Sequence, residues 1–583
     1  MLTPAQSDLL RWRGRDALAA FGLFLATAAI VLWQNAHVAV LWDLSYVLDT
    51  AARISHGQIP YRDFPLALAP LTFALHALLI RLAGRVFFFH VLLIAALGGL
   101  GTVLTWRIVL RSLARRIDRP GVAPLALLLA APLVFLGLYC VFPHPSYDCD
   151  AMLAVLLALF LLQKLDDHQP TLALAAGAAT VLPLFFKQNI GLAFLAAVVF
   201  LVVLLLVANR FAPTRPGARV LWIVLAGAAA ALALALFTLH GLVGLPNYLH
   251  WTLGFAAHRR MPGLAAMASI YTDRFLLFSL TSVVAGLLLL RGPLTGYGWA
   301  ATAWARRAAF LLLAAPLLFP LAVLALYEES EVRGDAFLAL FPVLLVLAGL
   351  LALARLRSFG SGLALAPLLP LAALAAAHGA LMSQQLWGST YALWPIFSYL
   401  LAEVLGELTL VPRAQWVGPM LGLTAALALL ICGIFYTVSE ERLSYIDLSE
   451  AVPATSTHPA LAGLHTPGPY LADFDELLNY AETQIDPLDT ILLLPGEDPF
   501  YFASGRAPRF PVLLFDPATD PFSPDALAAE ARKQQVKWLI LKHELQMDSD
   551  PTPDRAATLA ALLPDYTLAT HLRAYDVYRR NGQ

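Results

Sequence analysis

The sequence has few charged residues. Asp, Glu, Lys and Arg make up 13% of its 583 residues, against roughly 25% in an average soluble domain. Hydrophobic residues make up 60%, and surface-to-volume scaling leaves every soluble chain a large exterior that water must wet. The composition therefore excludes a soluble globular protein and predicts a polytopic membrane protein. The excess of Ala, Leu and Arg indicates a bacterial source.

Cysteine and net charge are also low. Three cysteines, Cys140, Cys149 and Cys432, are too few for a disulfide scaffold or a Cys-based zinc site. Cys140 and Cys149 could pair, but free thiols in apolar segments are the favoured interpretation. A net charge of -1 without a basic block gives no reason to expect a nucleic-acid partner.

Neither a Gly-rich phosphate fingerprint nor a nucleophile-elbow motif is present, which disfavours a Rossmann domain and a Ser-His-Asp hydrolase.

Long apolar runs recur along the chain, and about 20 apolar residues suffice to cross a membrane. The first run follows Arg11, Arg13 and Arg15, so the positive-inside rule predicts a cytoplasmic N-terminus. Thirteen spans are predicted, and this odd number places the C-terminal part outside. They are Ala17–Trp33, Val86–Leu110, Val122–Phe142, Ala151–Leu165, Leu172–Phe186, Ile190–Ala208, Val220–Leu242, Phe275–Leu290, Ala308–Leu326, Ala336–Ala354, Leu363–Leu381, Trp394–Leu410 and Val417–Val438.

One further apolar segment, Pro70–Gly84, decides the topology. It is short and contains His76 and Arg81. If it crossed the membrane, the arginines after Leu110 would lie outside. If it lies in the outer interface as an amphipathic helix, those arginines and those of the later inner loops lie inside. We therefore expect an interfacial helix.

From Ser439 onward the sequence is richer in Asp, Glu and Pro and can no longer span a membrane. Short apolar runs of buried-strand type predict a small α/β domain. The predicted fold is thus an all-α membrane domain over residues 1–438, with a first outer loop at 34–85, and an extracytoplasmic α/β domain over residues 439–583. Its predicted elements are strands at Thr490–Leu494 and Val536–Lys542, helix starts at Ser523-Pro524-Asp525 and Thr552-Pro553-Asp554, and a hairpin over Tyr566–Tyr578.

Polar residues of one chemical pattern gather on the predicted outer face. A carboxylate at the water–lipid boundary can act as a general base, and partial desolvation raises its pKa toward a useful range. A lysine at membrane depth is functional by default and can pair with a lipid phosphate as that phosphate leaves. The candidate catalytic residues are Asp43, Asp148 and Asp150, and the candidate substrate-binding residues are Lys187, Tyr46, Tyr61, Arg62, Asp63, Tyr147, Arg259 and Arg260.

The first outer loop resembles that of a known superfamily. Asp43-x-x-Tyr46, then Gly57-Gln-Ile-Pro-Tyr-Arg-Asp-Phe64 and a Pro-Leu amphipathic segment, is similar to the first outer loop of GT-C membrane glycosyltransferases. The nearest branch is that of protein O-mannosyltransferases and lipid A aminoarabinose transferases, which is glycosyltransferase family 39-like. The acidic second loop, the lysine after the fifth span, the thirteen spans and the outer α/β domain extend the resemblance.

The resemblance implies roles for the matched residues. Asp43 would activate the acceptor, Asp148 or Asp150 would be the second acidic residue of the same cavity, and Lys187 would contact the carrier phosphate. Many relatives place an Asp-Glu pair in the first loop, whereas Leu44 follows Asp43 here, so the acceptor stays open. Oligosaccharyltransferases of the superfamily hold a divalent metal with acidic residues of these loops, while other branches need none. A metal cofactor therefore stays open as well.

Each candidate also has a structural interpretation. Asp43 could cap an interfacial helix over 43–55, Asp148 and Asp150 could be solvated acids at a helix start, and Lys187 could snorkel to the headgroups. Arg62 and Asp63 could form a local ion pair that holds the loop. Arg259 and Arg260 could bind a phosphate or an anionic acceptor, form a salt bridge with Asp273, or contact headgroups.

The predicted function is an inverting glycosyltransferase in the bacterial cytoplasmic membrane. It would move a hexosyl or pentosyl group from a polyprenyl-phosphate carrier to a lipid, glycan or protein hydroxyl on the outer face. A transporter or flippase of lipid-linked sugars is the alternative from another class, and Glu403 and Glu407, one helical turn apart, are the residues that favour it. A glycan ligase or polymerase using a pyrophosphate-linked donor is the third.

Overall fold

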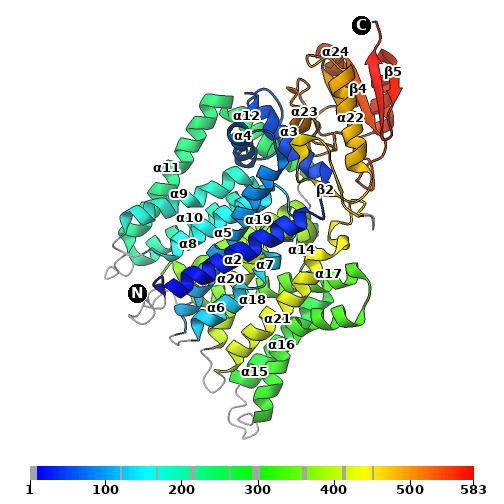
Figure 1. Cartoon of the computed structure of the whole chain (residues 1–583). Coiled ribbons are helices and arrows are strands. Elements are labelled where there is room, and N and C mark those ends of the chain that lie inside the picture. The colour runs from blue at the N-terminus through cyan, green and yellow to red at the C-terminus, as the bar shows by residue number, and fades with distance from the viewer. Residues whose placement is uncertain are drawn as a thin grey trace.

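The chain folds into a bundle of helices with a sheet-containing unit at one end (Figure 1). The structure, a computed structural model, describes residues 10–117, 121–165, 169–210, 217–260, 264–291, 303–357, 364–409, 415–448 and 452–582. We call the end of the bundle that carries the C-terminal unit the docking end.

Each of the thirteen predicted spans corresponds to a helical segment, and eight helical segments among the described residues are long and apolar enough to cross a membrane. The chain is therefore a multi-pass membrane protein. The segments are α2 (Gly14–Asn35), α5 (Phe87–Ala114), α6 with α7 (Val122–Ala130, Leu133–Leu136), α8 (Tyr147–Gln163), α9 (Pro170–Phe186), α10 (Gln188–Arg210), α11 (Ala218–Val243), α15 (Arg274–Arg291), α16 (Ala303–Leu326), α17 with α18 (Ser330–Leu338, Leu340–Leu356), η4 with α19 (Ala366–Leu368, Leu369–Ser389), α20 (Trp394–Leu408) and α21 (Val417–Val438).

Short helices occupy the connections. The residues between α11 and α15 form α12 (Leu245–Leu249), the π-helical turn η1 (His250–Phe255), α13 (Ala256–Arg260) and α14 (Leu264–Ser269). The turn η5 (Thr390–Ala392) precedes α20, and η6 (Glu440–Leu443) follows α21. All three cysteines are free and buried, so Cys140 and Cys149 do not pair.

Two helices, α3 (Leu41–Ser55) and α4 (Leu71–Ala83), lie in the predicted first outer loop. The 13 residues of α4 cover about 20 Å at 1.5 Å per residue, which is less than the ~30 Å apolar core of a bilayer. The helix packs mainly against α3 and makes fewer contacts with α5 and α9. Its length agrees with the interfacial helix expected at Pro70–Gly84.

The C-terminal unit is built on a four-stranded sheet of order β3-β4-β6-β5. The parallel pair is β3 (Ile491–Leu494) and β4 (Trp538–Lys542), while β6 (Tyr575–Arg580) runs antiparallel to β4 and to β5 (Tyr566–His571). Both predicted strands and the predicted hairpin are confirmed. The remaining elements are β1 (Ala454–Thr455), the turn η7 (Pro459–Leu461), β2 (His465–Thr466), α22 (Tyr470–Gln484), α23 (Phe500–Ser504), α24 (Pro524–Lys533), α25 (Arg555–Leu562) and the turn η8 (Leu563–Asp565).

One of the two predicted helix starts is wrong by two residues. Ser523 caps α24 as expected, accepting a hydrogen bond from the Ala526 N–H. In α25, by contrast, the cap is Asp554, at φ +42°, and not Thr552. The N–H of Thr552 donates to the Asp550 carboxylate at 2.8 Å, and this Asx turn holds Thr552 ahead of the helix.

Helix α3 is fastened to the C-terminal unit along one face. Every fourth residue of the helix makes a polar contact with that unit, and such residues share a face. Apolar residues of α3 and α5 also join residues of α22 and β3 in one buried cluster. The polar contacts are Leu41 N–H to Gln546 Oε1 (2.9 Å), Ser45 Oγ to Gly496 O (2.7 Å), Phe502 N–H to Asp49 Oδ1 (2.7 Å), and Arg53 to Pro511 O (2.7 Å) and Phe510 O (2.6 Å).

The shared cluster crosses the predicted domain boundary. Helix α21 ends at Val438, but the first outer loop packs with residues beyond it. The division into residues 1–438 and 439–583 therefore stays a prediction, and α3 is held from both sides of it.

We predict that Arg53→Lys weakens this docking. A lysine cannot present the planar fork that reaches two adjacent carbonyls, and a hydrogen bond from a charged group contributes about 2 kcal/mol. Thermal unfolding of the detergent-purified chain measures the loss as a lower midpoint. Arg81→Lys is the matched control, because Arg81 donates to Ile54 O and Ser55 O within the same loop. An equal shift for both variants would contradict a special role for Arg53.

Candidate functional site

Lys187 lies in a one-residue reversal between α9 and α10. Its backbone is extended, with φ −145°, and its N–H donates to Pro183 O at 3.0 Å. The two helices approach closely here, since a Cβ on Gly191 would lie 2.0 Å from the Leu184 nitrogen. Only glycine allows this approach, so the sharp turn fixes the place of the lysine.

The side chain of Lys187 is buried, not extended to the membrane surface. The residue is 3% exposed, so the predicted alternative of snorkelling to headgroups is wrong. Its Nζ lies 2.5 Å from Asp148 Oδ1 and 4.9 Å from the centre of the Tyr147 ring. A carboxylate and an aromatic face together stabilise the ammonium in a largely dry place.

The two acids at the start of α8 have different partners. Asp148 faces Lys187, whereas buried Asp150 accepts hydrogen bonds from Thr72 Oγ1 on α4 (2.6 Å) and from the Tyr139 hydroxyl. Asp150 thereby ties α4 to α8. The described residues contain no group of three or more His, Cys, Asp or Glu side chains placed to hold a metal.

Asp43 lies in the first turn of α3 without capping it. The N-cap is Val40, whose own side chain makes no capping hydrogen bond, and the Leu41 N–H donates to Gln546 Oε1, so the predicted capping role of Asp43 is wrong. Asp43 is half-buried, and its Oδ2 accepts a hydrogen bond from the Tyr445 hydroxyl at 3.0 Å. The sequence did not indicate a role for Tyr445, because this residue follows the last span and no motif connects it with the first outer loop.

Aromatic rings connect the helix of Asp43 with the Lys187 pair. Tyr46, one turn after Asp43, lies 6.5 Å from the Tyr147 ring in an edge-to-face arrangement and 5.5 Å from Phe73. Tyr147 in turn lies under the Lys187 ammonium. The structure therefore brings Asp43, Tyr46, Tyr147, Asp148 and Lys187 to the docking end of the bundle.

Three further predicted binding residues hold the loop itself. Tyr61 is buried, donates to Leu68 O at 2.6 Å and packs on Tyr248. Arg62 and Asp63 form the local ion pair at 2.9 Å, and the hydrogen bond from Arg62 lowers the pKa of Asp63. Asp63 also accepts the Ile59 N–H. The backbones of Arg259 and Arg260 end α13, and their side chains lie outside the described residues.

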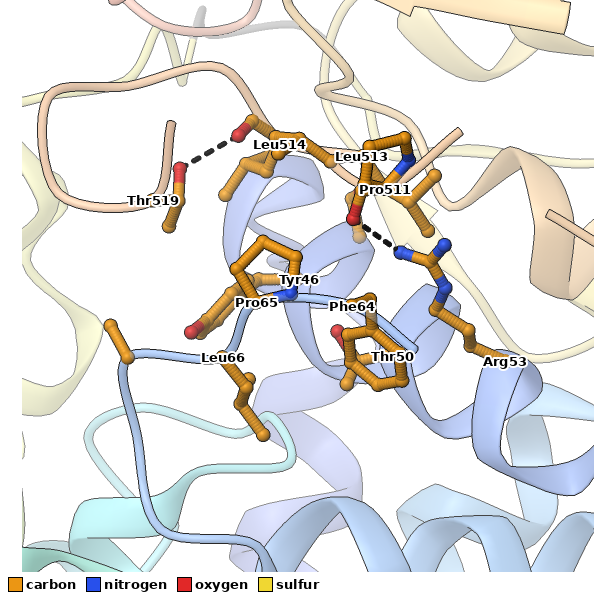
Figure 2. Close-up of a pocket in the computed structure, with 13 residues that line it drawn as sticks. Tyr46, Thr50, Arg53, Phe64, Pro65, Leu66, Pro511, Leu513, Leu514 and Thr519 are labelled. Carbon is orange, nitrogen blue, oxygen red and sulfur yellow. Dashed lines mark hydrogen bonds between the residues drawn. The ribbon is translucent and has the colours of Figure 1, made fainter. Parts of the chain in front are cut away.

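A cavity lies beside Tyr46 between α3 and the C-terminal unit (Figure 2). Tyr46 and Thr50 line it from α3, Pro65 and Leu66 from the following loop, and residues 511–514 from the C-terminal unit. Arg53 closes one edge by donating to Pro511 O. The cavity thus adjoins the Asp43 region, and its walls come from both parts of the chain.

His144 positions the start of α3. Its Nε2 accepts the Val40 N–H at 3.0 Å, three residues before Asp43. Burial, together with the nearby Arg442 cation, lowers the pKa of His144 to about 3, so the ring is a neutral acceptor at ordinary pH. Local sequence patterns give no signal for this contact, because Val40 and His144 are 104 positions apart.

Glu403 and Glu407, the residues that favour a transporter, lie in ion pairs toward the other end of the bundle. Arg355 contacts Glu403 at 2.7 Å and Glu407 at 3.1 Å, and Arg116 contacts Glu407 as well. Both carboxylates are therefore already neutralised by arginine partners. A proton or ion relay based on them loses its structural support.

Comparisons with known proteins give likeness in structure alone. No protein-family model matches the sequence, and no curated protein matches it. ArnT from Cupriavidus metallidurans, in a structure bound to undecaprenyl phosphate, is similar over 96% of this chain and 97% of its own at 14% identity, with a TM-score of 0.42. An oligosaccharyltransferase from Archaeoglobus fulgidus is similar over 90% and 69% at 13% identity, with a TM-score of 0.46. Values this low carry no functional assignment.

We predict that His144 makes the protein sensitive to acid. An unfolded histidine has a pKa near 6.5, above the folded value of about 3, so the unfolded state binds more protons. Stability is therefore complete above pH 6.5 and is lost as pH falls below it, by up to about 1.4 kcal/mol per pH unit. Thermal unfolding at pH 7.5 and 5.5 measures this loss.

His144→Gln should remove that part of the pH dependence, because an amide oxygen can still accept the Val40 N–H but does not titrate. His56→Gln, at the exposed end of α3, is the matched control. Equal pH dependence in wild type and His144→Gln would disprove the assignment.

Proposed function

We propose that the chain is a membrane glycosyltransferase that moves a sugar from a polyprenyl-phosphate carrier to an acceptor hydroxyl. The observation that carries this proposal is the buried Lys187–Asp148 pair, joined through Tyr147 and Tyr46 to the helix of Asp43. A cation and a carboxylate are thereby supplied by different helices at one end of a membrane bundle. This cation and this carboxylate are the two groups that displacement of a phosphate by a hydroxyl requires.

Lys187 would bind the carrier phosphate. An ammonium ion acts as a compact point charge toward phosphate, and its attraction is strong where water is excluded. In the free protein Asp148 serves as its counter-ion, and a phosphate oxygen would take the place of this carboxylate. Asp148 is therefore a positioning residue for Lys187 in this mechanism.

Asp43 would be the general base. The acceptor oxygen attacks the anomeric carbon, its proton passes to the Asp43 carboxylate, and the bond between that carbon and the phosphate oxygen breaks. The electron pair leaves with the lipid phosphate, whose extra negative charge Lys187 stabilises. One in-line displacement inverts the anomeric configuration. The Tyr445 hydroxyl orients Asp43 from the C-terminal side.

The C-terminal unit would help to select the acceptor. Its residues 511–514 form one wall of the cavity beside Tyr46, and its hydrogen bonds fix α3. The acceptor, whether a lipid, a glycan or a protein, would enter between this unit and the first loop. Among the described residues no three His, Cys, Asp or Glu side chains are grouped to hold a metal ion, and no step above requires one.

The docking end would face the outside of a bacterial cytoplasmic membrane, with the N-terminus inside. The positive-inside rule supports this orientation, because Arg111, Arg115, Arg116 and Arg355 lie at or near the ends of α5 and α18, toward the opposite end of the bundle. Donors linked through pyrophosphate, as a ligase or polymerase would use, also present negatively charged phosphate oxygens to Lys187, and the binding experiment compares the two kinds of carrier.

We predict that Lys187→Ala weakens binding of undecaprenyl phosphate about tenfold, which corresponds to about 1.4 kcal/mol. Native mass spectrometry of the detergent-purified chain, titrated with undecaprenyl phosphate, undecaprenyl pyrophosphate or phosphatidylethanolamine, measures it. Lys164→Ala is the matched control, since Lys164 is an exposed lysine at the far end of α8. No preference for the polyprenyl lipids over phosphatidylethanolamine would overturn the carrier-dependent mechanism.

We predict that Asp43→Asn abolishes transfer and leaves carrier binding unchanged, because an amide cannot take the proton. General-base catalysis typically contributes 10²- to 10⁴-fold to a rate. Turnover is measured with a radiolabelled polyprenyl-phosphate sugar and membrane extract as the acceptor source. Asp63→Asn, in the exposed ion pair of the same loop, should stay active. Full turnover by Asp43→Asn would exclude Asp43 as the base.

A further inference from the structure

A second polar cavity lies among the helices at the end of the bundle opposite the docking end. The start of α5 contacts the C-terminal unit through Phe88 N–H and Ala462 O. The 28 residues of α5 then rise about 40 Å to Ser112, Arg115 and Arg116. These residues line the cavity, so it is separated from the Asp43 and Lys187 region by the length of the helix.

The cavity has a volume of about 290 Å³, close to the lower limit of roughly 300 Å³ for small-molecule sites. Its walls come from α5, α18, η4 and α20. They are Ser112, Arg115, Arg116, Arg355, Ala366, Pro367 and Glu403. Three guanidinium groups thus face it, against one carboxylate.

The arginines are held in place by neighbouring groups. Arg355 contacts Pro367 O (2.9 Å), Glu403 (2.7 Å) and Glu407 (3.1 Å). Arg116 pairs with Glu407, and Arg115 donates to Gln163 O. Glu403 also accepts from Ser112. Fixed guanidinium groups lose little freedom when an anion binds, and their planar forks match phosphate oxygens.

Among the described residues around this cavity, arginines outnumber carboxylates. Arg111, one turn before Arg115, adds a fourth guanidinium beside Phe160, while Glu403 and Glu407 supply two negative charges. A surplus of partly buried cations between membrane helices is costly unless an anion enters. Basic pockets between membrane helices on the cytoplasmic side bind anionic headgroups.

We propose that this cavity binds an anionic phosphate group, supplied by a lipid headgroup of the adjacent leaflet or by a soluble phosphate compound. Its oxygens bind to the guanidinium groups of Arg115, Arg116 and Arg355, and the Ser112 hydroxyl donates a further hydrogen bond. The site is separate from the sugar transfer proposed above, and it stands or fails independently of Lys187.

The test is anion binding to the detergent-purified full-length chain. In one arm, native mass spectrometry compares phosphatidylglycerol with phosphatidylcholine. In the other, thermal unfolding is followed against inorganic phosphate, with sodium chloride at equal ionic strength as reference. Saturable phosphatidylglycerol adducts identify the lipid as the source, while saturable stabilisation by inorganic phosphate identifies a soluble compound.

Arg116→Gln should weaken the observed binding about tenfold, the effect of losing one charged hydrogen bond. Glu403→Gln should strengthen it, because a repelling carboxylate becomes an amide that can still accept from Ser112. Arg357→Gln is the matched control, since Arg357 is exposed two residues after Arg355. Arg116→Lys keeps the charge without the planar fork, so its binding should lie between that of the wild type and that of Arg116→Gln, which shows that the variant chain folds.

Two results would overturn the site. One is no preference for phosphatidylglycerol together with no effect of inorganic phosphate beyond that of the salt. The other is an equal loss of binding in Arg116→Gln and Arg357→Gln, which would indicate general attraction to a basic surface and not a built cavity.

Discussion

The attachment of α3 to the C-terminal unit is the constraint on which the candidate site depends. Leu41, Ser45, Asp49 and Arg53 bind that unit at every fourth position, so one face of the helix is fixed. The remaining surface of the helix carries Asp43 and Tyr46. His144 holds the N–H of Val40, the N-cap residue of the same helix, from the bundle. A helix of 15 residues that would be marginal alone thereby holds a carboxylate in one place.

The buried charges divide into two groups with different uses. At the docking end Lys187 pairs with Asp148 beside the Tyr147 ring, which suits an ion pair that opens when a phosphate arrives. Toward the other end, Glu403 and Glu407 share arginine partners in a network, which suits a fixed anion cradle. Desolvation makes either arrangement costly without a compensating partner, and this cost explains why the charges lie in pairs and clusters.

Apolar periodicity and turn chemistry made most of the fold predictable. All thirteen predicted spans are helical segments, because a run of about 20 apolar residues has few alternatives in a membrane. The strands at Ile491–Leu494 and Trp538–Lys542 and the start of α24 followed from local composition. The start of α25 did not, because the Asx turn at Asp550 competed for Thr552.

The sequence by itself determined that the chain is a membrane protein and that its first loops carry acids, tyrosines and one isolated lysine. Those facts depend on composition and on neighbours along the chain. Only the tertiary structure decided that Asp148, not Asp150, faces Lys187, that Tyr445 bonds Asp43, and that Glu403 is paired. The two residues of each contact are between 39 and 402 positions apart in the sequence. Local sequence patterns do not specify which side chain so far away a residue will contact.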